Sequence, residues 1–329
     1  MDFTNKVVLI TGGTGSFGSN FIRHFLKQRC PKRIRIYSRD EHKQADLIND
    51  EYYGGMLDGF IGDVRDKDRL RRAMEGVDIV VHAAALKRVQ SCEYNPFETV
   101  KTNIIGSMNV VDCALDVGVE KVLAVSSDKA VAPLNLYGAT KMCMEKLIIN
   151  ANNYRGKGKT KFCCVRYGNV AGSKGSVIPL WKDYALKRLP IPITNPNATR
   201  FWFDMKDVVA FATEVLEQMD YVSGGEIFIP KLPSVKMIDV FHAMFTNHDF
   251  SVTGDRVGDK LHETMILEDE MKHTIDATDK FIILPQEPHW DYTVKPKGQT
   301  CNGRPSYDSG SNPEFLGVEE IKERLSRVG

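Results

Sequence analysis

A glycine-rich turn between an apolar run and an amphipathic stretch is the feature that most constrains the fold of this chain. Val7–Ile10 leads directly into Thr11-Gly12-Gly13-Thr14-Gly15-Ser16-Phe17-Gly18, and Gly18–Gln28 has apolar residues at helical spacing. In such a strand–turn–helix, the first glycine permits a tight turn, the second lets backbone approach a pyrophosphate and the third allows close helix–strand packing. The helix N-terminus adds free N–H groups. The residues expected to form this phosphate cradle are Gly12, Thr14, Gly15, Ser16, Phe17 and Gly18.

Strand-like and helical segments alternate regularly through the first half of the chain. The expected strands are Val7–Ile10, Ile34–Tyr37, Phe60–Ile61, Ile79–His82, Val122–Ser126 and Lys161–Val165. The expected helices between them are Gly18–Gln28, Lys67–Glu75, Thr99–Val117 and Gly138–Asn153. This alternation is typical of a parallel sheet covered by helices. We therefore predict an α/β protein with a Rossmann-like, doubly wound parallel sheet.

After Gly168 the alternation is lost and proline and glycine become frequent. We expect residues 1–170 to form the nucleotide-binding domain, with a helix near 203–220 that returns to the sheet. Residues 171–202 and 232–329 are expected to form a smaller C-terminal substrate lobe. Its irregular segment 289–310 is interpreted either as a loop over a site or as a mobile tail.

The end of the second expected strand indicates which dinucleotide binds. An acid there suits the ribose 2′-hydroxyl of NAD, whereas cations suit the 2′-phosphate of NADP. Here Ser38, Arg39 and Lys43 could hold a phosphate, and the alternative is a solvated, charged helix start. We therefore predict NADP as the cofactor. Residues that follow the third and fourth strands, Asp63, Val64 and Ala83, are expected beside it.

Tyr137 and Lys141 lie one helical turn apart at the start of the helix after the fifth strand, so they share a face. A nearby ammonium lowers the pKa of a tyrosine hydroxyl, which would make Tyr137 a general base for oxidation of a substrate alcohol. Ser126 and Ser127 end the preceding strand, where a hydroxyl can orient the tyrosine and the substrate.

Asp128 and Lys129 follow those serines and provide an acid and a base beyond the needs of a simple ketoreductase. One chemistry that uses both is oxidation at carbon 4 of a hexose, loss of water across carbons 5 and 6, and hydride return to carbon 6. Lys129 would take the carbon 5 proton, with a lowered pKa, and Asp128 would protonate the leaving hydroxyl, with a raised pKa. The alternative interpretation is a surface Asp–Lys pair.

Bulk composition narrows the class of protein further. A formal net charge of +1 gives no basic stripe for nucleic acid. The seven cysteines show no CxxC spacing and the eight histidines no metal-binding spacing, so neither disulfides nor a metal site is expected. No apolar stretch approaches a membrane span or a signal peptide, and we expect a cytoplasmic protein.

Several of these segments together resemble the soluble UDP-N-acetylglucosamine 4,6-dehydratases, members of the extended short-chain dehydrogenase/reductase family. The most specific are Ser-Ser-Asp-Lys-Ala (126–130), Arg-Tyr-Gly-Asn-Val (166–170) and Asp-Lys-Leu-His-Glu (259–263), and the resemblance covers nearly the whole chain. It implies inversion at carbon 5, tightly held NADP, a place at the start of pseudaminic acid biosynthesis and a homo-oligomer. It also implies that Asp128, Lys129 and Tyr137 are catalytic, with Lys141 as the partner of the tyrosine.

The same resemblance implies further contacts to the ligands. Lys87 and Asn169 would touch cofactor or substrate, and Arg256 would meet the UDP diphosphate. The full set expected for the substrate is Lys87, Ser126, Ser127, Asn169, Val177, Arg200, Arg256 and Asp259, while Val170 is expected at the cofactor. Two interpretations of Arg200-Phe201-Trp202 are given equal weight: an edge of the core, or a contact to the nucleotide. His262-Glu263 is interpreted as a helix start or a contact within the second lobe rather than as a catalytic pair.

The chain departs from the family at Arg256-Val257-Gly258-Asp259, where the family usually has Arg-Pro-Gly-Glu. The shorter acid could still accept a hydrogen bond from the substrate. Two rival functions remain open: another NADP-linked sugar-nucleotide enzyme, such as a 4-epimerase or ketoreductase, and a catalytically silent NADP-binding sensor. The Asp128–Lys129 pair argues against an epimerase or ketoreductase, which expels no water. The intact Ser127, Tyr137 and Lys141 argue against a silent sensor, which has no need of them.

Overall fold

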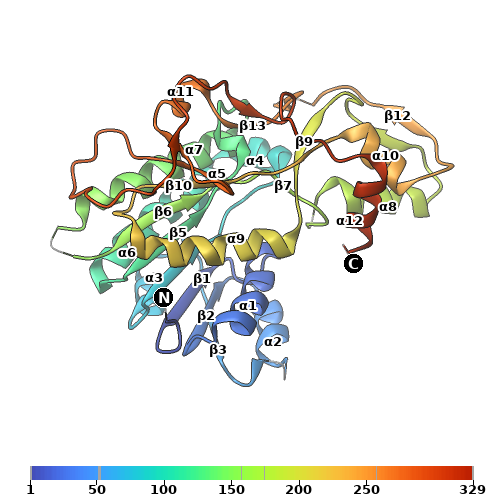
Figure 1. Cartoon of the computed structure of the whole chain (residues 1–329). Coiled ribbons are helices and arrows are strands. Elements are labelled where there is room, and N and C mark those ends of the chain that lie inside the picture. Colours follow the sequence, from blue (N-terminus) through green and yellow to red (C-terminus); the bar gives the residue numbers. More distant parts are fainter. Residues whose placement is uncertain (1, 51–52, 157, 174, 257, 328–329) are drawn as a thin grey trace.

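The computed structural model describes residues 2–50, 53–156, 158–173, 175–256 and 258–327. Its centre is a ten-stranded sheet in the order β16-β14-β15-β10-β6-β5-β4-β1-β2-β3 (Figure 1). These strands are β1 (Val7–Thr11), β2 (Arg33–Ser38), β3 (Leu57–Ile61), β4 (Ile79–His82), β5 (Lys121–Val125), β6 (Lys161–Val165), β10 (Ile227–Pro230), β14 (Thr274–Asp276), β15 (Lys280–Ile283) and β16 (Gln299–Thr300).

The helices of three or more residues fill the connections. In chain order they are α1 (Ser16–Arg29), α2 (Glu41–Ile48), α3 (Lys67–Met74), α4 (Val89–Tyr94), α5 (Pro96–Val100), η2 (Lys101–Ile105), α6 (Gly106–Val117), η3 (Asp128–Ala130), α7 (Leu136–Asn150), η4 (Ala151–Tyr154), α8 (Val177–Leu186), α9 (Met205–Gln218), η5 (Met219–Tyr221), α10 (Met237–Met244), α11 (Glu268–Met271) and α12 (Val318–Ser326). The long helix expected at Thr99–Val117 therefore begins at α5 and contains one wider, π-type turn, η2.

Seven strands, from β3 across to β10, run parallel in the sheet. β4 is buried throughout, as is most of β1 and β5, because helices cover both faces and the runs are rich in β-branched residues. α1 packs against α9, while α3, α6 and α7 pack together. The fold prediction, a doubly wound Rossmann-like sheet, is confirmed.

A second hydrophobic cluster lies apart from the main core, on the right of Figure 1 around α8, α10 and α12. Trp181 is fully buried within it and donates its indole N–H to Pro192 O at 2.8 Å. The remaining strands are short: β7 (Asn169–Val170), β8 (Ile191–Ile193), β9 (Thr199–Phe203), β11 (Ser234–Lys236), β12 (Phe250–Val252), β13 (Thr264–Ile266) and β17 (Tyr307–Asp308). Within the described part of the chain, no helix combines the length and apolar character that crossing a membrane requires.

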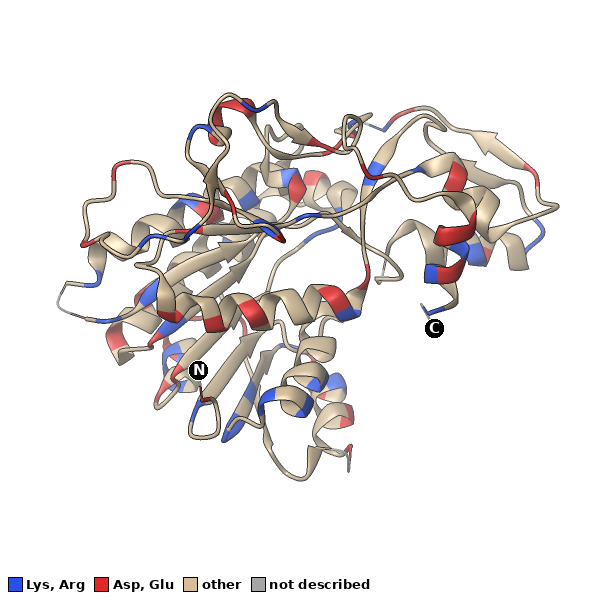
Figure 2. Ribbon diagram, in the orientation of Figure 1, with Lys and Arg blue, Asp and Glu red and all other residues tan. Residues whose placement is uncertain are grey.

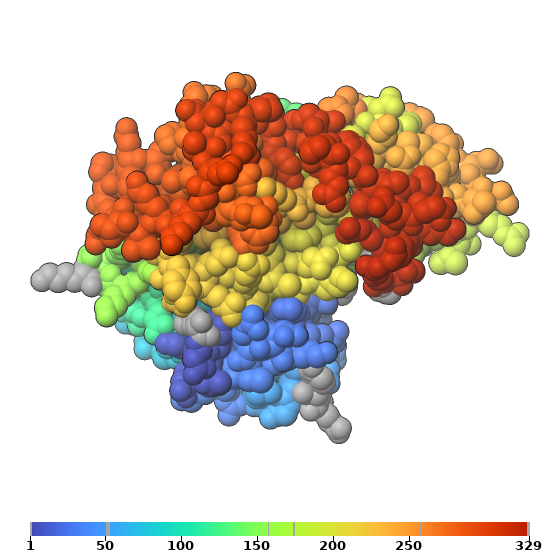
Figure 3. Space-filling view, in the orientation of Figure 1, coloured from blue at the N-terminus to red at the C-terminus, as the bar shows by residue number. Residues whose placement is uncertain are grey.

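The C-terminal segment does not stay in one region. β15 pairs antiparallel with β10, and β14 and β16 extend the same edge of the main sheet. Figure 3 shows this segment, orange to red, covering the upper side of the molecule from the sheet to the second cluster. Part of residues 232–329, which the sequence assigns to a substrate lobe, therefore packs with the nucleotide-binding sheet, and the division into domains stays a prediction.

Candidate active site

The glycine turn after β1 combines tight packing with one open position. Gly12 has a φ of +68°, and a β-carbon there would lie 2.9 Å from the backbone of Ala84. At Gly18 it would lie 2.5 Å from the Cα of Gly13, whereas at Gly15 it would meet only the Gly12 carbonyl, at 3.1 Å. Packing therefore requires glycine at 12 and 18, and the exposed Gly15 leaves room for a ligand to approach the backbone.

The other residues expected at the cofactor surround this turn. Thr14 and Ser16 are partly exposed beside Gly15, and the Phe17 ring stacks on Phe21 with centroids 5.6 Å apart. Val64 is buried, Ala83 and Val170 are partly exposed, and Lys87 is exposed. Because these residues follow the carboxyl ends of the parallel strands, they lie where open α/β sheets bind ligands.

The three residues expected to hold a 2′-phosphate are placed differently from one another. The ammonium of Lys43 pairs with Asp40, and the hydroxyl of Ser38 accepts a hydrogen bond from Gln44 Nε2 at 3.0 Å. The Arg39 side chain is 61% exposed, and its guanidinium lies 3.7 Å from Asp63. Burial works against the charge of Asp63, but Arg65 holds the pKa of that carboxyl below its usual range, and Arg39 adds to the effect. Arg39 is therefore the cation best placed to meet a phosphate.

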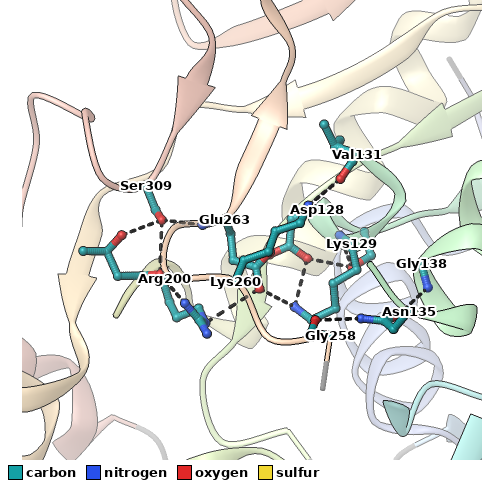
Figure 4. A network of polar contacts seen from close by, with 12 residues as sticks. Asp128, Lys129, Val131, Asn135, Gly138, Arg200, Gly258, Lys260, Glu263 and Ser309 are labelled. Carbon is teal, nitrogen blue, oxygen red and sulfur yellow. Dashed lines mark hydrogen bonds and ion pairs between the residues drawn. The ribbon is translucent and has the colours of Figure 1, made fainter. Parts of the chain in front are cut away.

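Asp128 and Lys129 form a buried cluster with a third residue, Glu263, rather than a surface pair (Figure 4). Lys129 Nζ lies 3.3 Å from Asp128 Oδ1 and 3.3 Å from Glu263 Oε1. Asp128 is fully buried and Glu263 is 3% exposed. Asp128 Oδ2 and Glu263 Oε2 have no hydrogen-bond partner among the described residues. One ammonium thus joins two buried carboxylates, each of which keeps one unused oxygen.

The two carboxyl groups of this cluster have pKa values that are shifted in opposite directions. Burial raises the pKa of Asp128, and the neighbouring charge of Glu263 raises it further, against the effect of Lys129. Burial also works against the charge of Glu263, but Lys129, Arg200 and Lys260 together lower its pKa. For Lys129, the two carboxylates outweigh burial and raise its pKa. The raised pKa expected for Asp128 is found, and the lowered pKa expected for Lys129 is not.

Tyr137 and Lys141 lie at the start of α7, but the lysine does not hold the tyrosine hydroxyl. Lys141 Nζ donates to Val125 O at 2.6 Å, and burial lowers its pKa to about 8. Burial raises the pKa of Tyr137 to about 12, while the Lys129 charge and a hydrogen bond with Ser127 act in the opposite direction. The expectation that Lys141 lowers the tyrosine pKa is therefore not met in the ligand-free geometry, where Lys129 is the cation that acts on it.

Ser126 and Ser127, the two serines before the cluster, differ in their hydrogen bonds. Ser127 Oγ donates to Asp128 Oδ1 at 2.8 Å, so this hydroxyl orients the acid. Ser126 Oγ is buried and has no partner among the described residues. Ser127 thus contacts both the acid and Tyr137, while Ser126 keeps its hydrogen-bonding capacity.

The loop that carries Glu263 is fixed from two sides. The backbone N–H of Glu263 donates to Ser309 Oγ at 2.9 Å, and Ser309 N–H donates to Glu263 O at 2.8 Å. Two residues on, Met265 O accepts from Arg166 Nη1 at 2.8 Å. Arg166 is itself buried between the carboxylates of Glu145 and Glu270. The Glu263 carboxylate therefore approaches Lys129 from a well-anchored backbone.

A cavity of about 200 Å³ opens beside Arg200, and residues of the second hydrophobic cluster, such as Trp181 and Trp202, form much of its wall. Five of the residues expected at the substrate line it: Asn169, Val177, Arg200, Arg256 and Asp259. Lys87, Ser126 and Ser127 do not line this cavity. Phe201 and Trp202 are buried, as the core interpretation expects, and Arg200 Nε lies 3.7 Å from Glu263. A nucleotide contact of this tripeptide stays a prediction. Val257 lies outside the described residues.

Four residues that shape the site were not among the site residues predicted from the sequence. Glu263 was interpreted as a lobe contact, and Lys260, which donates to Val131 O at 2.6 Å, was not singled out. Asn103, in the wider turn η2, bonds Leu86 and Thr140, and the buried His82 bridges Thr11 and Ser107. Glu263 and Lys260 belong to the Asp-Lys-Leu-His-Glu segment, the one pattern that could have drawn attention to them.

His, Cys, Asp and Glu side chains form no group of three or more that could hold a metal ion, as far as the described ranges extend. Lys and Arg are interspersed with Asp and Glu over the whole molecule (Figure 2).

Comparison with known proteins identifies the family of this chain. The model of the family "polysaccharide biosynthesis protein" matches residues 8–285. The chain is 44% identical to the UDP-N-acetylglucosamine 4,6-dehydratase (inverting) of Campylobacter jejuni, over 99% of each chain. It is 37% identical to the UDP-glucose 4-epimerase of Rickettsia massiliae, over 98% of this chain and 96% of that one. The solved structure of Pen from Bacillus thuringiensis superposes with a TM-score of 0.88 at 36% identity, covering 99% of both chains. The chain therefore belongs to the polysaccharide biosynthesis protein family, with sugar-nucleotide dehydratases among its relatives.

Proposed function

We propose that this protein catalyses the 4,6-dehydration of UDP-N-acetylglucosamine with bound NADP and inversion at carbon 5. The observation that carries the proposal is the buried Asp128–Lys129–Glu263 cluster beside Tyr137. A dehydration needs an acid and a base in addition to the group that removes the hydroxyl proton, and this cluster supplies them. The name of the Campylobacter jejuni relative supports the sugar nucleotide and the inversion.

Each proton transfer has a candidate residue in this site. Tyr137 accepts the carbon 4 hydroxyl proton, helped by the Lys129 charge that opposes the effect of its burial. Asp128, whose pKa burial raises, protonates the departing carbon 6 hydroxyl, and Ser127 holds the carboxyl in place. Lys129 takes the carbon 5 proton, which is acidic once carbon 4 is a ketone.

The residues around the glycine turn fit a nicotinamide dinucleotide. The open backbone at Gly15 would hold the pyrophosphate and Arg39 the 2′-phosphate, with Val64 and Ala83 nearby. When bound, the nicotinamide would supply the hydride acceptor and donor that the oxidation at carbon 4 and the reduction at carbon 6 require.

The cavity lined by Arg200 and Arg256 would receive the UDP moiety. Two guanidinium groups at one cavity suit a diphosphate, since each can fork onto its oxygens. Asn169 and Asp259 line the same cavity and can hydrogen-bond the sugar or the uridine. The homo-oligomer, the cytoplasmic location and the role in pseudaminic acid biosynthesis that the resemblance implies remain predictions.

A UDP-sugar 4-epimerase is the second candidate, because the Rickettsia massiliae relative carries that name. An epimerase oxidises and reduces carbon 4 and expels no water. It would leave Asp128 and Lys129 without a proton to move, so the buried cluster favours dehydration.

Proton NMR of UDP-N-acetylglucosamine incubated with the protein in deuterated water tests the proposal. Dehydration replaces the carbon 6 methylene by a methyl group, whose doublet collapses to a singlet as carbon 5 takes up deuterium. Ring couplings then report the configuration at carbon 5. Formation of the C4 epimer without a methyl signal would establish the epimerase instead, and an unchanged spectrum would refute both. The Lys129→Ala variant is expected to form no methyl signal.

A further inference from the structure

The protonation of Lys129 is the step that the proposed function leaves unexplained. The proposed base must be neutral to take the carbon 5 proton, yet two carboxylates at 3.3 Å hold its side chain as an ammonium. Tyr137, Arg200 and Lys260 are the other titratable or charged groups that act on this cluster. The Lys129 proton needs an acceptor within reach before Lys129 can take the carbon 5 proton.

Glu263 has the geometry of that acceptor. Its Oε1 faces the Lys129 ammonium, its Oε2 is buried without a hydrogen-bond partner in the described structure, and its side chain is only 4% exposed. Asp128 is less suited, because Ser127 already donates to the oxygen that faces Lys129. In addition, the Asp128 carboxyl, whose pKa is raised, must already carry the proton that it gives to the carbon 6 hydroxyl. The like charge of Glu263 also favours the protonated form of Asp128, so the two carboxyl groups take different roles.

We propose that Glu263 is a positioning residue that takes one proton from the Lys129 ammonium and so converts Lys129 into the base. This inference rests on the proposed function. In the step, an N–H bond of Lys129 breaks, an O–H bond forms on Glu263 Oε1, and the ion pair becomes a neutral amine and a neutral carboxylic acid. No other reactant takes part.

Substrate entry supplies the driving force for this transfer. In the free protein the Lys129 side chain is 24% exposed, so water still solvates the ammonium. A sugar placed over the cluster removes that water, and loss of water disfavours charged forms relative to neutral ones. Arg200 stabilises the Glu263 charge from 3.7 Å and also lines the cavity, so a diphosphate bound there would draw this cation away from the carboxylate.

Titration of Lys129 in the free protein tests the coupling without any turnover. NMR of protein carrying ¹³C-labelled lysine would follow the Lys129 resonance, assigned with Lys129→Ala, in wild type, Glu263→Gln and Glu263→Asp. Removing one of two opposite charges is expected to lower the Lys129 pKa by about one unit or more in Glu263→Gln. The exposed Glu268→Gln, at the start of α11, is the matched control and is expected to leave the Lys129 pKa unchanged. An unchanged Lys129 titration in folded Glu263→Gln would overturn the proposal.

Kinetics with UDP-N-acetylglucosamine tests the proton transfer itself. Glu263→Gln should lower kcat by roughly 10²-fold or more with little change in KM, and should lose deuterium incorporation at carbon 5 to the same extent. Glu263→Asp, which keeps the carboxylate, should recover part of kcat. If kcat and exchange persist in Glu263→Gln, or if Glu263→Asp is no better than Glu263→Gln, Glu263 is not the acceptor. A wild-type enzyme that leaves this substrate unchanged refutes the proposed function instead, and the free-protein titration still decides the coupling.

Discussion

The backbone of Lys129 packs so closely on Gly138 that a β-carbon at residue 138 would lie 2.1 Å from the Lys129 carbonyl oxygen. Gly138 is in the first turn of α7, next to Tyr137, and its N–H donates to Asn135 Oδ1 at 2.9 Å. Asn135 also donates to Gly258 O at 3.1 Å, in the segment that leads to Glu263 (Figure 4). The helix start, the acid–base pair and this segment are thus held as one unit.

Replacing Gly138 by alanine should therefore impair catalysis more than folding. The new methyl group meets backbone rather than a movable side chain, so Lys129 must shift by about 1 Å, a displacement that can cost roughly 10²-fold in rate. We expect Gly138→Ala to lower kcat by about that factor and the free energy of unfolding by about 1–3 kcal/mol. Gly317→Ala is the matched control, because its φ is −77° and a β-carbon there would meet only Glu320 Oε2, at 3.6 Å. Equal kcat values for the two variants would contradict the close packing.

Arg166 should be a major source of stability for the site. Its guanidinium is buried between Glu145 and Glu270, and Arg166→Met leaves the buried Glu145 carboxylate without its cation. Removing one partner of a buried ion pair costs about 3–5 kcal/mol, and urea denaturation would measure this loss. The control is Arg304→Met, whose partly exposed pair with Asp276 should contribute less than about 1 kcal/mol. Similar losses in the two variants would show that the burial of Arg166 has no special effect.

Residues close together in the sequence were predicted well. The glycine turn, the succession of strands along the chain up to β6 and the adjacent Asp128–Lys129 pair all follow from local patterns, since the alternation of strands and helices limits how the chain can wind. Contacts between distant segments could not be read in this way. Lys129 meets Glu263 only because the C-terminal part of the chain returns over the sheet, and β14 to β16 are short strands without a clear period.

The spacing of Tyr137 and Lys141 led to a wrong expectation about the pKa of the tyrosine. One helical turn between Tyr137 and Lys141 places both side chains on a common face, but the Lys141 ammonium reaches the carbonyl of Val125 at the end of β5. A pattern of spacing cannot show which of several acceptors a long, flexible lysine side chain will choose. The pKa of Tyr137 therefore depends on Lys129, a residue outside the pattern.

The choice between NADP and NAD should depend on Arg39. Because Lys43 pairs with Asp40 while Arg39 is 61% exposed, Arg39→Ala should weaken NADP binding by roughly 10- to 100-fold and leave NAD binding nearly unchanged. Lys43→Ala should have a smaller effect on NADP. Calorimetric titration of cofactor-free protein with each dinucleotide measures both. Equal weakening of NADP and NAD by Arg39→Ala would mean that Arg39 does not contact the 2′-phosphate.

His82 should make the stability of the protein depend on pH. Its ring is buried between Thr11 and Ser107, and burial, aided by the charge of Lys141, lowers its pKa from 6.5 to about 3. Between these values the unfolded chain binds a proton that the folded protein does not, so His82 destabilises the fold progressively as the pH falls below 6.5. From about pH 7 to pH 5, wild type should lose roughly 2 kcal/mol of unfolding free energy more than His82→Gln loses. The control is His42→Gln, at an exposed histidine, whose unfolding free energy should change with pH as that of wild type does. If wild type and His82→Gln instead show the same pH dependence, His82 is protonated as readily in the folded protein as in the unfolded chain.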